Sequence, residues 1–297
     1  EIVLGALFLA SRKIVQGIEW EKTLIGSGDD IPSLVEKGKS AFAGPEIEGK
    51  TLGVVGLGAI GVRVANAAHH LGMNVIGFDP YLSVDAAWHL TRFAHKANSL
   101  DELLEKADYI TIHVPSTPST KGMFNSEAFA KMKKGARLLN FSRGSLVDEN
   151  DVQEAIANGT VATYVTDFGS EALLKCENVI CLPHLGASTP ESEENCAVMA
   201  ANEIKDFLEN GNIKNSVNFP ECDMGKKTGE RITILHKNVT GMIKKITDAL
   251  ESLNIANMIN KSKGDNAYTM IDVDGRCDAA AIDAIAAMPD VIKVTLL

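Results

Sequence analysis

Three residues with side chains suited to anion binding and proton transfer each follow a short, mostly apolar run. Arg143 comes after the run at 136–141, Asp167 after "YVT" and His184 after "VICLP". A guanidinium binds a carboxylate through two parallel hydrogen bonds, and an imidazole exchanges its proton near neutral pH. Each residue alone has an ordinary interpretation, as a solvated cation, a turn cap and a loop residue. Together they indicate acid–base chemistry on a small anion.

The segment "TLGVVGLGAIG" places Gly56, Gly58 and Gly61 directly after an apolar run and before a helical pattern. The first glycine permits a tight turn, the second lets a pyrophosphate approach the backbone, and the third lets helix and strand pack closely. Another apolar run ends at Asp79, where an acid can hydrogen-bond a ribose hydroxyl and repel a 2′-phosphate. The alternative is a structural glycine turn followed by a surface aspartate. We expect the segment to bind NAD rather than NADP.

The elements that must position these residues alternate between strand and helix from residue 51 onward. This alternation, with continuously apolar strands, predicts an α/β fold with a Rossmann-like, doubly wound parallel sheet. Because such sheets bind ligands beyond the carboxyl ends of their strands, we expect the three residues to share an edge with the glycine loop. The predicted strands are 51–55, 74–78, 109–114, 136–141, 161–166 and 179–182, and the predicted helices are 1–18, 60–71, 101–106, 126–133 and 149–158.

The C-terminal part of the chain has a different pattern. A long helix is expected after Ser188 or Thr189, with Pro190 in its first turn and Gly211 at its end. The segment 220–230 is typical of a linker, and 231–297 follows the order strand, helix, strand, strand, helix, strand of the ferredoxin-like βαββαβ fold. We therefore predict a nucleotide-binding domain at 1–182, part of a substrate domain at 183–222, a linker at 223–230 and a small domain at 231–297.

Composition limits the classes of partner. The formal charge of −10 lies within 1–230, since 231–297 hold eight basic and eight acidic residues. An acidic body argues against binding nucleic acid or an anionic membrane, and the apolar start is shorter than the ~20 residues of a membrane helix. Five cysteines without a C-x-x-C pair favour a reducing compartment, so we expect a cytoplasmic protein. No cluster has the spacing of metal ligands.

The motifs "GVVGLGAIG", "HVPSTPSTKGM", "NFSRGSLVDE", "TDFGSE" and "PHLGAST" occur in the order found in the D-isomer-specific 2-hydroxyacid dehydrogenases, and the sequence resembles that family along its whole length. The resemblance implies that Arg143 binds the substrate, that His184 is the acid/base, and that Asp167 holds the nicotinamide carboxamide. The cofactor-binding positions that it implies are Gly56, Gly58, Ala59, Ile60, Gly61, Asp79, His113, Pro115, Ser142, Asp167 and Gly186.

The family also implies a carboxylate that orients the histidine. Its glutamate usually follows the carboxamide-binding aspartate by five residues, whereas Glu171 follows Asp167 by four. We expect Glu171 to take this role, with Glu177 or another acid as the alternative. A further departure concerns the front of the chain, where the family's first substrate-domain segment is expected but not found. We therefore expect a chain that binds NAD and turns over poorly.

Within the family, the sequence most resembles members that oxidise D-3-phosphoglycerate in L-serine biosynthesis and carry a C-terminal ACT domain. This implies a homodimer or homotetramer with L-serine as effector, bound between paired ACT domains near His236, Asn238 and Asn254. The alternative is that these three are ordinary strand-end and turn residues, and that the domain serves only in dimerisation. Two rival functions remain: a dehydrogenase for lactate or 2-hydroxyglutarate, and a NAD-sensing binding protein on the same scaffold.

Overall fold

The computed structural model describes all 297 residues, which form two compact units. Unit 1 comprises Glu1–Gly186 and unit 2 comprises Ala187–Leu297. Each unit has hydrophobic clusters of its own. No helix in the structure combines the length and the apolar character needed to cross a membrane.

Unit 1 is built on a seven-stranded sheet in the order β3-β2-β1-β4-β5-β6-β7. Every neighbouring pair is parallel, so all the carboxyl ends meet at one edge. Since the order reverses beside β1, the doubly wound Rossmann-like sheet expected from the sequence is confirmed. The strands are β1 (Thr51–Val55), β2 (Asn74–Phe78), β3 (Ala94–Lys96), β4 (Tyr109–Ile112), β5 (Ala136–Asn140), β6 (Val161–Thr166) and β7 (Val179–Cys181).

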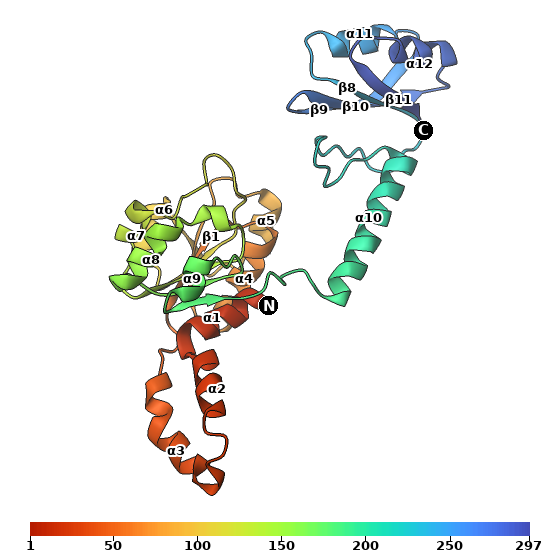
Figure 1. Ribbon diagram of the computed structural model, residues 1–297. Coiled ribbons are helices and arrows are strands. Elements are labelled where there is room, and N and C mark those ends of the chain that lie inside the picture. Colours follow the sequence, from red (N-terminus) through yellow and green to blue (C-terminus); the bar gives the residue numbers. More distant parts are fainter. The chain divides into compact units, whose positions relative to one another are not determined.

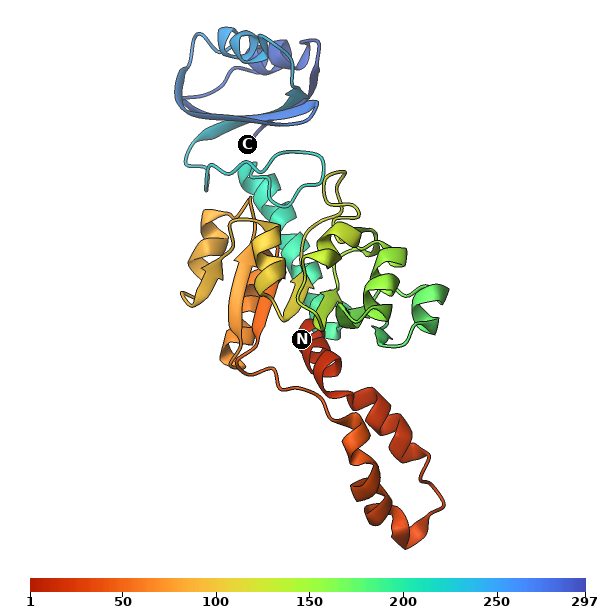
Figure 2. The same ribbon diagram turned by 90° about the vertical axis from the view of Figure 1, so that its left-hand side faces the viewer.

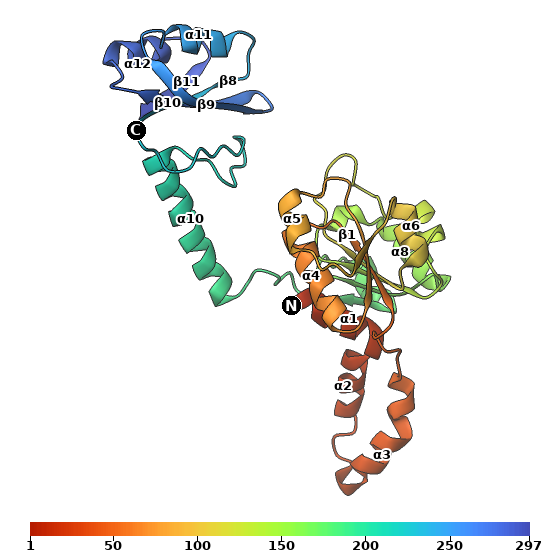
Figure 3. The ribbon, with the colours of Figure 1, turned by 180° about the vertical axis from the view of Figure 1, so that it is seen from behind.

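Helices cover both faces of this sheet (Figures 1 and 3). Successive strand residues point to opposite faces, so Val54 packs in one hydrophobic cluster and Val55 in the other. One cluster includes residues of α1 (Ile2–Arg12) and α4 (Ala59–His70), with α5 (Val84–His89) at its margin. The other includes residues of α6 (Leu100–Lys106), α7 (Ser126–Ala130), α8 (Glu149–Ala157) and α9 (Glu171–Lys175).

The helix expected at 1–18 is in fact two helices. Lys13 adopts a left-handed conformation with φ of 47°, which ends α1 and starts α2 (Ile14–Lys22) in a new direction. The chain then continues through η1 (Gly28–Asp30), α3 (Ile31–Gly38) and η2 (Lys39–Phe42), and α2 and α3 extend away from the sheet side by side (Figures 1 and 3). An unbroken helix was the wrong prediction because nothing in the local sequence marks Lys13 as a break.

In unit 2, the long helix α10 (Pro190–Asn210) begins and ends where the sequence predicts. Thr189 Oγ1 accepts a hydrogen bond from the Ser192 N–H, and Gly211 ends the helix with φ of 75°. The rest of unit 2 contains β8 (Glu230–Lys237), α11 (Met242–Asp248), β9 (Asn254–Lys263), β10 (Asn266–Asp274), α12 (Ala279–Ala286) and β11 (Val291–Leu296). Its antiparallel sheet has the order β11-β8-β10-β9, and both short helices lie on one face (Figure 2). The predicted βαββαβ order is therefore present.

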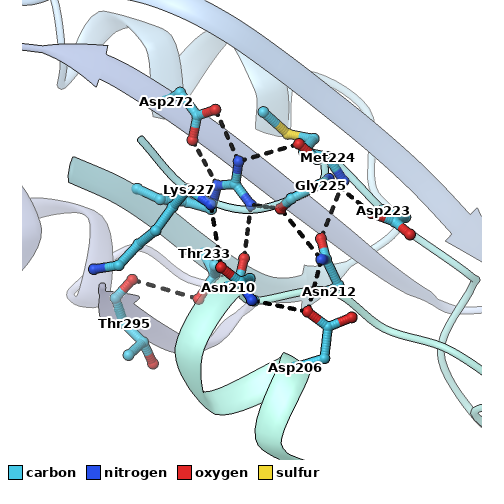
Figure 4. A network of polar contacts seen from close by, with 12 residues as sticks. Asp206, Asn210, Asn212, Asp223, Met224, Gly225, Lys227, Thr233, Asp272 and Thr295 are labelled. Carbon is cyan, nitrogen blue, oxygen red and sulfur yellow. Dashed lines mark hydrogen bonds and ion pairs between the residues drawn. The ribbon is translucent and has the colours of Figure 1, made fainter. Parts of the chain in front are cut away.

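Part of the segment predicted as a linker packs onto this sheet, while residues 225–229 are exposed. Arg231 is 1% exposed, and its Nε and Nη2 donate to the two oxygens of Asp272 at 2.6 and 2.9 Å. Its Nη1 donates to the carbonyl oxygens of Asn210 and Gly225 at 2.8 and 2.9 Å (Figure 4). Cys222 is fully buried with Tyr268 and Met270 on the face opposite the helices. The polar composition of 220–230 hid this packing, because the groups that hold the segment are distant in sequence.

Candidate active site

The residues singled out for chemistry lie beyond adjacent strands of the sheet in unit 1. Arg143 follows β5, Asp167 follows β6 and His184 follows β7, and these three strands are neighbours. The glycine loop follows β1 at the same edge. The sheet topology thus brings together a guanidinium, a carboxylate and an imidazole that are up to 41 residues apart in sequence.

The turn that carries Arg143 is fixed by buried Asn140. The Asn140 Nδ2 donates to the Arg143 carbonyl at 2.9 Å, and its Oδ1 accepts from the Ser142 N–H at 3.2 Å. The Thr166 hydroxyl donates to the Asn140 carbonyl at 3.0 Å, which ties the turn to β6. The guanidinium itself is exposed, and Nη1 donates to the Ser142 carbonyl at 2.6 Å. No carboxylate forms an ion pair with it, so its remaining donors are free for an anionic ligand.

Asp167 and His184 form the one ion-pair contact among these residues. Nδ1 of His184 lies 3.3 Å from Oδ2 of Asp167, whose side chain is 3% exposed. The ring of Phe168 packs edge-on against His184, with 5.1 Å between the ring centroids. Burial raises the pKa of the Asp167 carboxyl, and the charges of His184 and Arg143 act in the opposite direction. A buried carboxylate therefore lies beside one ring nitrogen of an exposed imidazole.

In this structure Glu171, predicted as the partner of His184, does not contact the imidazole, and its role stays a prediction. Glu171 begins α9, its side chain is 85% exposed, and its Oε1 lies 2.5 Å from Nζ of Lys175. The hydroxyl of Ser170 accepts from the Leu173 N–H and so fixes the helix start. Because the helix starts there, Glu171 faces Lys175 one turn on, and the histidine contacts Asp167 instead.

The glycine loop has the conformation that the spacing predicts. Gly56 has φ of 90°, and a Cβ on Gly61 would lie 2.0 Å from the Gly56 carbonyl oxygen, so this close packing of loop and helix needs glycine. Asp79 ends the neighbouring strand, and its Oδ2 and Oδ1 accept from the N–H groups of Leu57 and Tyr81, each at 2.8 Å. The carboxylate expected to bind ribose therefore also supports the loop.

Two features of the carboxyl-end edge of the sheet suit the polar groups of NAD. A Cβ built on Gly58 meets no atom within 4 Å, which leaves open space beside the first turn of α4, where Ala59 and Ile60 follow. Phosphate oxygens can reach the unpaired N–H groups of such a helix start. Oδ1 of Asp167 is buried without a hydrogen-bond partner, so it suits a donor such as a carboxamide. The residues present therefore match the polar groups of the cofactor.

The other predicted cofactor positions lie at the same edge. His113 follows β4, is half-buried, and its Nε2 lies 2.9 Å from the Thr111 hydroxyl; burial lowers its pKa to about 4. Pro115 is exposed, and the Ser142 hydroxyl donates to the Val114 carbonyl at 2.9 Å. Gly186 is exposed, and a Cβ on it would meet nothing. Their contacts with a cofactor stay predictions.

Three residues that shape the site were missed in the sequence: Asn140, Thr166 and Phe168. Asn140 and Thr166 are polar but fully buried, and together they hold the Arg143 turn. Polar residues within otherwise apolar strands, as in "ARLLN" and "VATYVT", are the signal that could have found them. Phe168 gave no signal, since its role depends on contacts with Gly144 and His184 from other strands.

The residues predicted to bind an effector lie in unit 2 and do not come together within one chain. His236 is 2% exposed, and both of its ring nitrogens are engaged, by the Lys237 carbonyl and the Thr269 hydroxyl at 2.8 Å each. Asn238 follows the end of β8 that pairs with the start of β10, whereas Asn254 pairs with the end of β10. A site formed by all three would need a second copy of the domain.

Comparison with known proteins decides the family. The sequence profile of the D-isomer specific 2-hydroxyacid dehydrogenase NAD-binding domain matches residues 4–186, more than half of the chain. The chain belongs to this family. As a member of the D-2-hydroxyacid dehydrogenases, it is 30% identical to the D-3-phosphoglycerate dehydrogenase of Escherichia coli K12, covering 100% of this chain and 72% of that protein. A putative D-3-phosphoglycerate dehydrogenase of Schizosaccharomyces pombe is 32% identical, covering 81% and 55%.

For other relatives, the alignment with this chain covers a smaller share of the relative's own length. The D-3-phosphoglycerate dehydrogenase of Bacillus subtilis is 41% identical, covering 62% of this chain and 36% of that protein. The chain thus spans about half the length of several curated relatives. Among solved structures, D-mandelate dehydrogenase of Rhodotorula graminis has a TM-score of 0.58 at 24% identity, covering 68% of this chain and 60% of that one. Protein TT0316 of Thermus thermophilus has a TM-score of 0.56 at 28% identity, covering 70% and 64%.

Proposed function

We propose that this chain acts as a D-3-phosphoglycerate dehydrogenase, which oxidises D-3-phosphoglycerate to 3-phosphohydroxypyruvate with NAD in L-serine biosynthesis. The observation that carries the proposal is the meeting of Arg143, Asp167 and His184 beyond β5, β6 and β7, at the edge that bears the glycine loop. The substrate is supported by the relatives of that name from Escherichia coli and Schizosaccharomyces pombe.

In this proposal, the side chains divide the reaction between them. NAD, when bound, supplies the hydride acceptor. Arg143 binds the substrate carboxylate and the oxygen on C2, because its planar fork suits two oxygens at once. His184 takes the proton of the C2 hydroxyl as the substrate is oxidised, and returns it in the reverse direction. Such a group contributes roughly 10²–10⁴-fold to the rate.

We further propose that the βαββαβ domain of unit 2 is an ACT regulatory domain that binds L-serine in a homodimer or homotetramer. Support comes from its element order and from the alignment of the Escherichia coli enzyme across the whole chain. Since Asn254 lies at the far end of the sheet from Asn238, serine would bind residues of two copies of the domain.

The test is NADH oxidation by this chain with 3-phosphohydroxypyruvate, pyruvate and 2-oxoglutarate, each with and without L-serine. We expect NADH to bind and 3-phosphohydroxypyruvate to react fastest, with slower turnover when serine is present. Preference for pyruvate or 2-oxoglutarate would overturn the substrate, and NADH that binds without any turnover would favour a NAD-sensing protein. A rate that serine does not change would overturn the effector assignment alone.

A further inference from the structure

We infer that Phe168 is a positioning residue, which holds the His184 imidazole in place relative to the turn that carries Arg143. Its side chain contacts both the imidazole and the residue that follows Arg143. The meaning of these contacts for catalysis rests on the proposed function, whereas the contacts themselves rest on the geometry of unit 1.

The imidazole of His184 has few other supports. It forms no hydrogen bond in the structure, and its one polar contact is the 3.3 Å approach of Nδ1 to Oδ2 of Asp167. Residues 183–189 are all exposed, so the chain around His184 supplies no buried neighbour. The ring centroids of Phe168 and His184 are 5.1 Å apart, with 67° between the ring planes. Aromatic pairs prefer such an edge-to-face arrangement, so Phe168 restricts the rotation of the imidazole.

Phe168 is not one of the residues that build the core of unit 1. Its side chain is only half-buried, and it belongs to neither of the two hydrophobic clusters on the faces of the sheet. Burial of apolar surface in the core therefore does not explain an aromatic ring at this position. The neighbours of the ring belong to the site instead.

The second contact of Phe168 is with the turn that carries Arg143. A Cβ built on Gly144 would lie 3.2 Å from Cβ and 3.4 Å from Cγ of Phe168, so the backbone beside Arg143 lies directly against this side chain. The Phe168 N–H donates to the buried Thr166 hydroxyl at 3.2 Å, and that hydroxyl donates to the Asn140 carbonyl at 3.0 Å. The backbone of Phe168 is thus tied to the same hydrogen bonds that fix the turn.

His184 and Arg143 are expected to act on the same oxygen of the substrate, so their separation matters for the rate. Arg143 would bind the C2 oxygen, and His184 would exchange a proton with it. A displacement of a reacting group by about 1 Å can cost roughly 10²-fold in rate. Removal of the Phe168 ring should therefore lower kcat. The KM of the keto acid and the affinity for NADH should change little, because they depend on Arg143 and on the glycine loop.

The experiment compares Phe168→Ala, Phe168→Leu and Phe168→Tyr with the wild-type chain in the reduction of 3-phosphohydroxypyruvate by NADH. We expect kcat to fall about tenfold or more in Phe168→Ala, with KM and NADH affinity within about threefold. Phe168→Leu should lose less, and Phe168→Tyr should keep the wild-type rate because it keeps the ring. The matched control is Phe93→Ala, since Phe93 is 50% exposed and stacks on a different histidine, His69, at 4.6 Å.

A measurement without substrate or cofactor tests the contact itself. In a ¹H–¹³C spectrum, the ring current of Phe168 shifts the Hε1 and Hδ2 signals of His184, which are identified by their absence in His184→Gln. We expect these shifts to disappear in Phe168→Ala, and ¹³C relaxation to show a more mobile imidazole. Neither property should change in Phe93→Ala.

Unchanged His184 signals in Phe168→Ala would overturn the inference, and so would an unchanged kcat. An equal loss of kcat, NADH affinity and melting temperature would also overturn it, because Phe168 would then only support the fold. If Phe168→Ala does not fold, Phe168→Leu decides the same questions. A wild-type chain without turnover would overturn the proposed function, while the His184 spectra would still decide whether Phe168 holds the imidazole.

Discussion

At the residue scale, the site depends on a few polar groups held by buried neighbours. The Arg143 guanidinium donates to the adjacent Ser142 carbonyl and keeps its other donors available, because Asn140 fixes the turn through the backbone. The imidazole of His184 is 60% exposed on its side chain, so it can reach a substrate, while its Nδ1 faces a buried carboxylate. The groups expected to react are exposed and the groups that hold them are buried, which is the pattern expected of an acid–base site.

The replacement of His184 by glutamine tests its acid–base role. The glutamine side chain keeps a polar group of similar size but cannot exchange a proton, so turnover should fall by roughly 10²–10⁴-fold. NADH affinity should stay within about twofold, because the loss concerns a proton and not a cofactor contact. Steady-state rates and NADH fluorescence titrations on the same samples provide the check. Loss of NADH binding together with turnover would mean that His184 has a structural role.

His113 should make unit 1 sensitive to mild acid. A histidine in the unfolded chain takes up its proton near pH 6.5, whereas burial lowers the pKa of folded His113 to about 4. Between these values the unfolded chain binds more protons, so the free energy of unfolding should fall as the pH drops from 6.5 to 4. The expected contribution is about 3 kcal/mol.

The measurement for His113 is urea unfolding followed by tryptophan fluorescence, since Trp20 and Trp88 both lie in unit 1. In His113→Gln the loss of stability between pH 6.5 and 4 should be smaller than in the wild type by about this amount. An identical pH dependence in the two proteins would show that His113 is not the group responsible.

At the scale of elements, two connections differ in how well the sequence predicts them. One is the loop between β1 and α4, and the other is the segment that follows α10. The glycine loop could be predicted because its spacing is local and its chemistry is repeated in many proteins. The packing of the α10 end against the small domain could not be predicted, since Arg231 pairs with Asp272, which lies 41 residues further along the chain. The break at Lys13 and the three-residue strand β3 were also missed, because neither leaves a periodic signal.

Two alanine substitutions in the glycine loop should have different effects. Gly61→Ala would put a Cβ 2.0 Å from the Gly56 carbonyl oxygen, so it should destabilise unit 1 by about 2 kcal/mol or more. Gly58→Ala meets no protein atom, so the melting temperature should stay unchanged while NADH affinity falls about tenfold or more. Thermal melting and NADH titration of both variants make the comparison. Full NADH affinity in Gly58→Ala would exclude close approach of the pyrophosphate there.

The replacement of Arg231 by methionine should loosen unit 2. The change leaves the Asp272 carboxylate without its partner and removes the donors to the carbonyls of Asn210 and Gly225, which should cost about 3 kcal/mol. Hydrogen exchange followed by mass spectrometry should become faster in β8, β10 and the segment 211–225, and stay unchanged in unit 1. Arg276→Met, at an exposed position in the same unit, is the matched control. Equal exchange in the two variants would contradict the role of Arg231.

At the scale of the whole molecule, the sequence predicted the fold of each domain better than the packing of the segments at the domain boundaries. The alternating apolar runs indicated the parallel sheet, and the βαββαβ order was read correctly from 231 onward. The packing of the segment before 231 was not predicted, because its backbone bonds to Asn210, Asn212 and Arg231, which only folding brings near. The contact of His184 with Asp167 could not be predicted either, since spacing along a loop does not define which acid faces the ring.

The central claim is that this chain transfers a hydride between NAD and C2 of a small 2-hydroxy acid. The most direct measurement incubates the chain with 3-phosphohydroxypyruvate and NADH that carries deuterium at C4, and analyses the product by mass spectrometry. The account predicts 3-phosphoglycerate with deuterium at C2, and very little of it from His184→Gln. Bound NADH without any deuterated hydroxy acid, from this or another 2-keto acid, would contradict it.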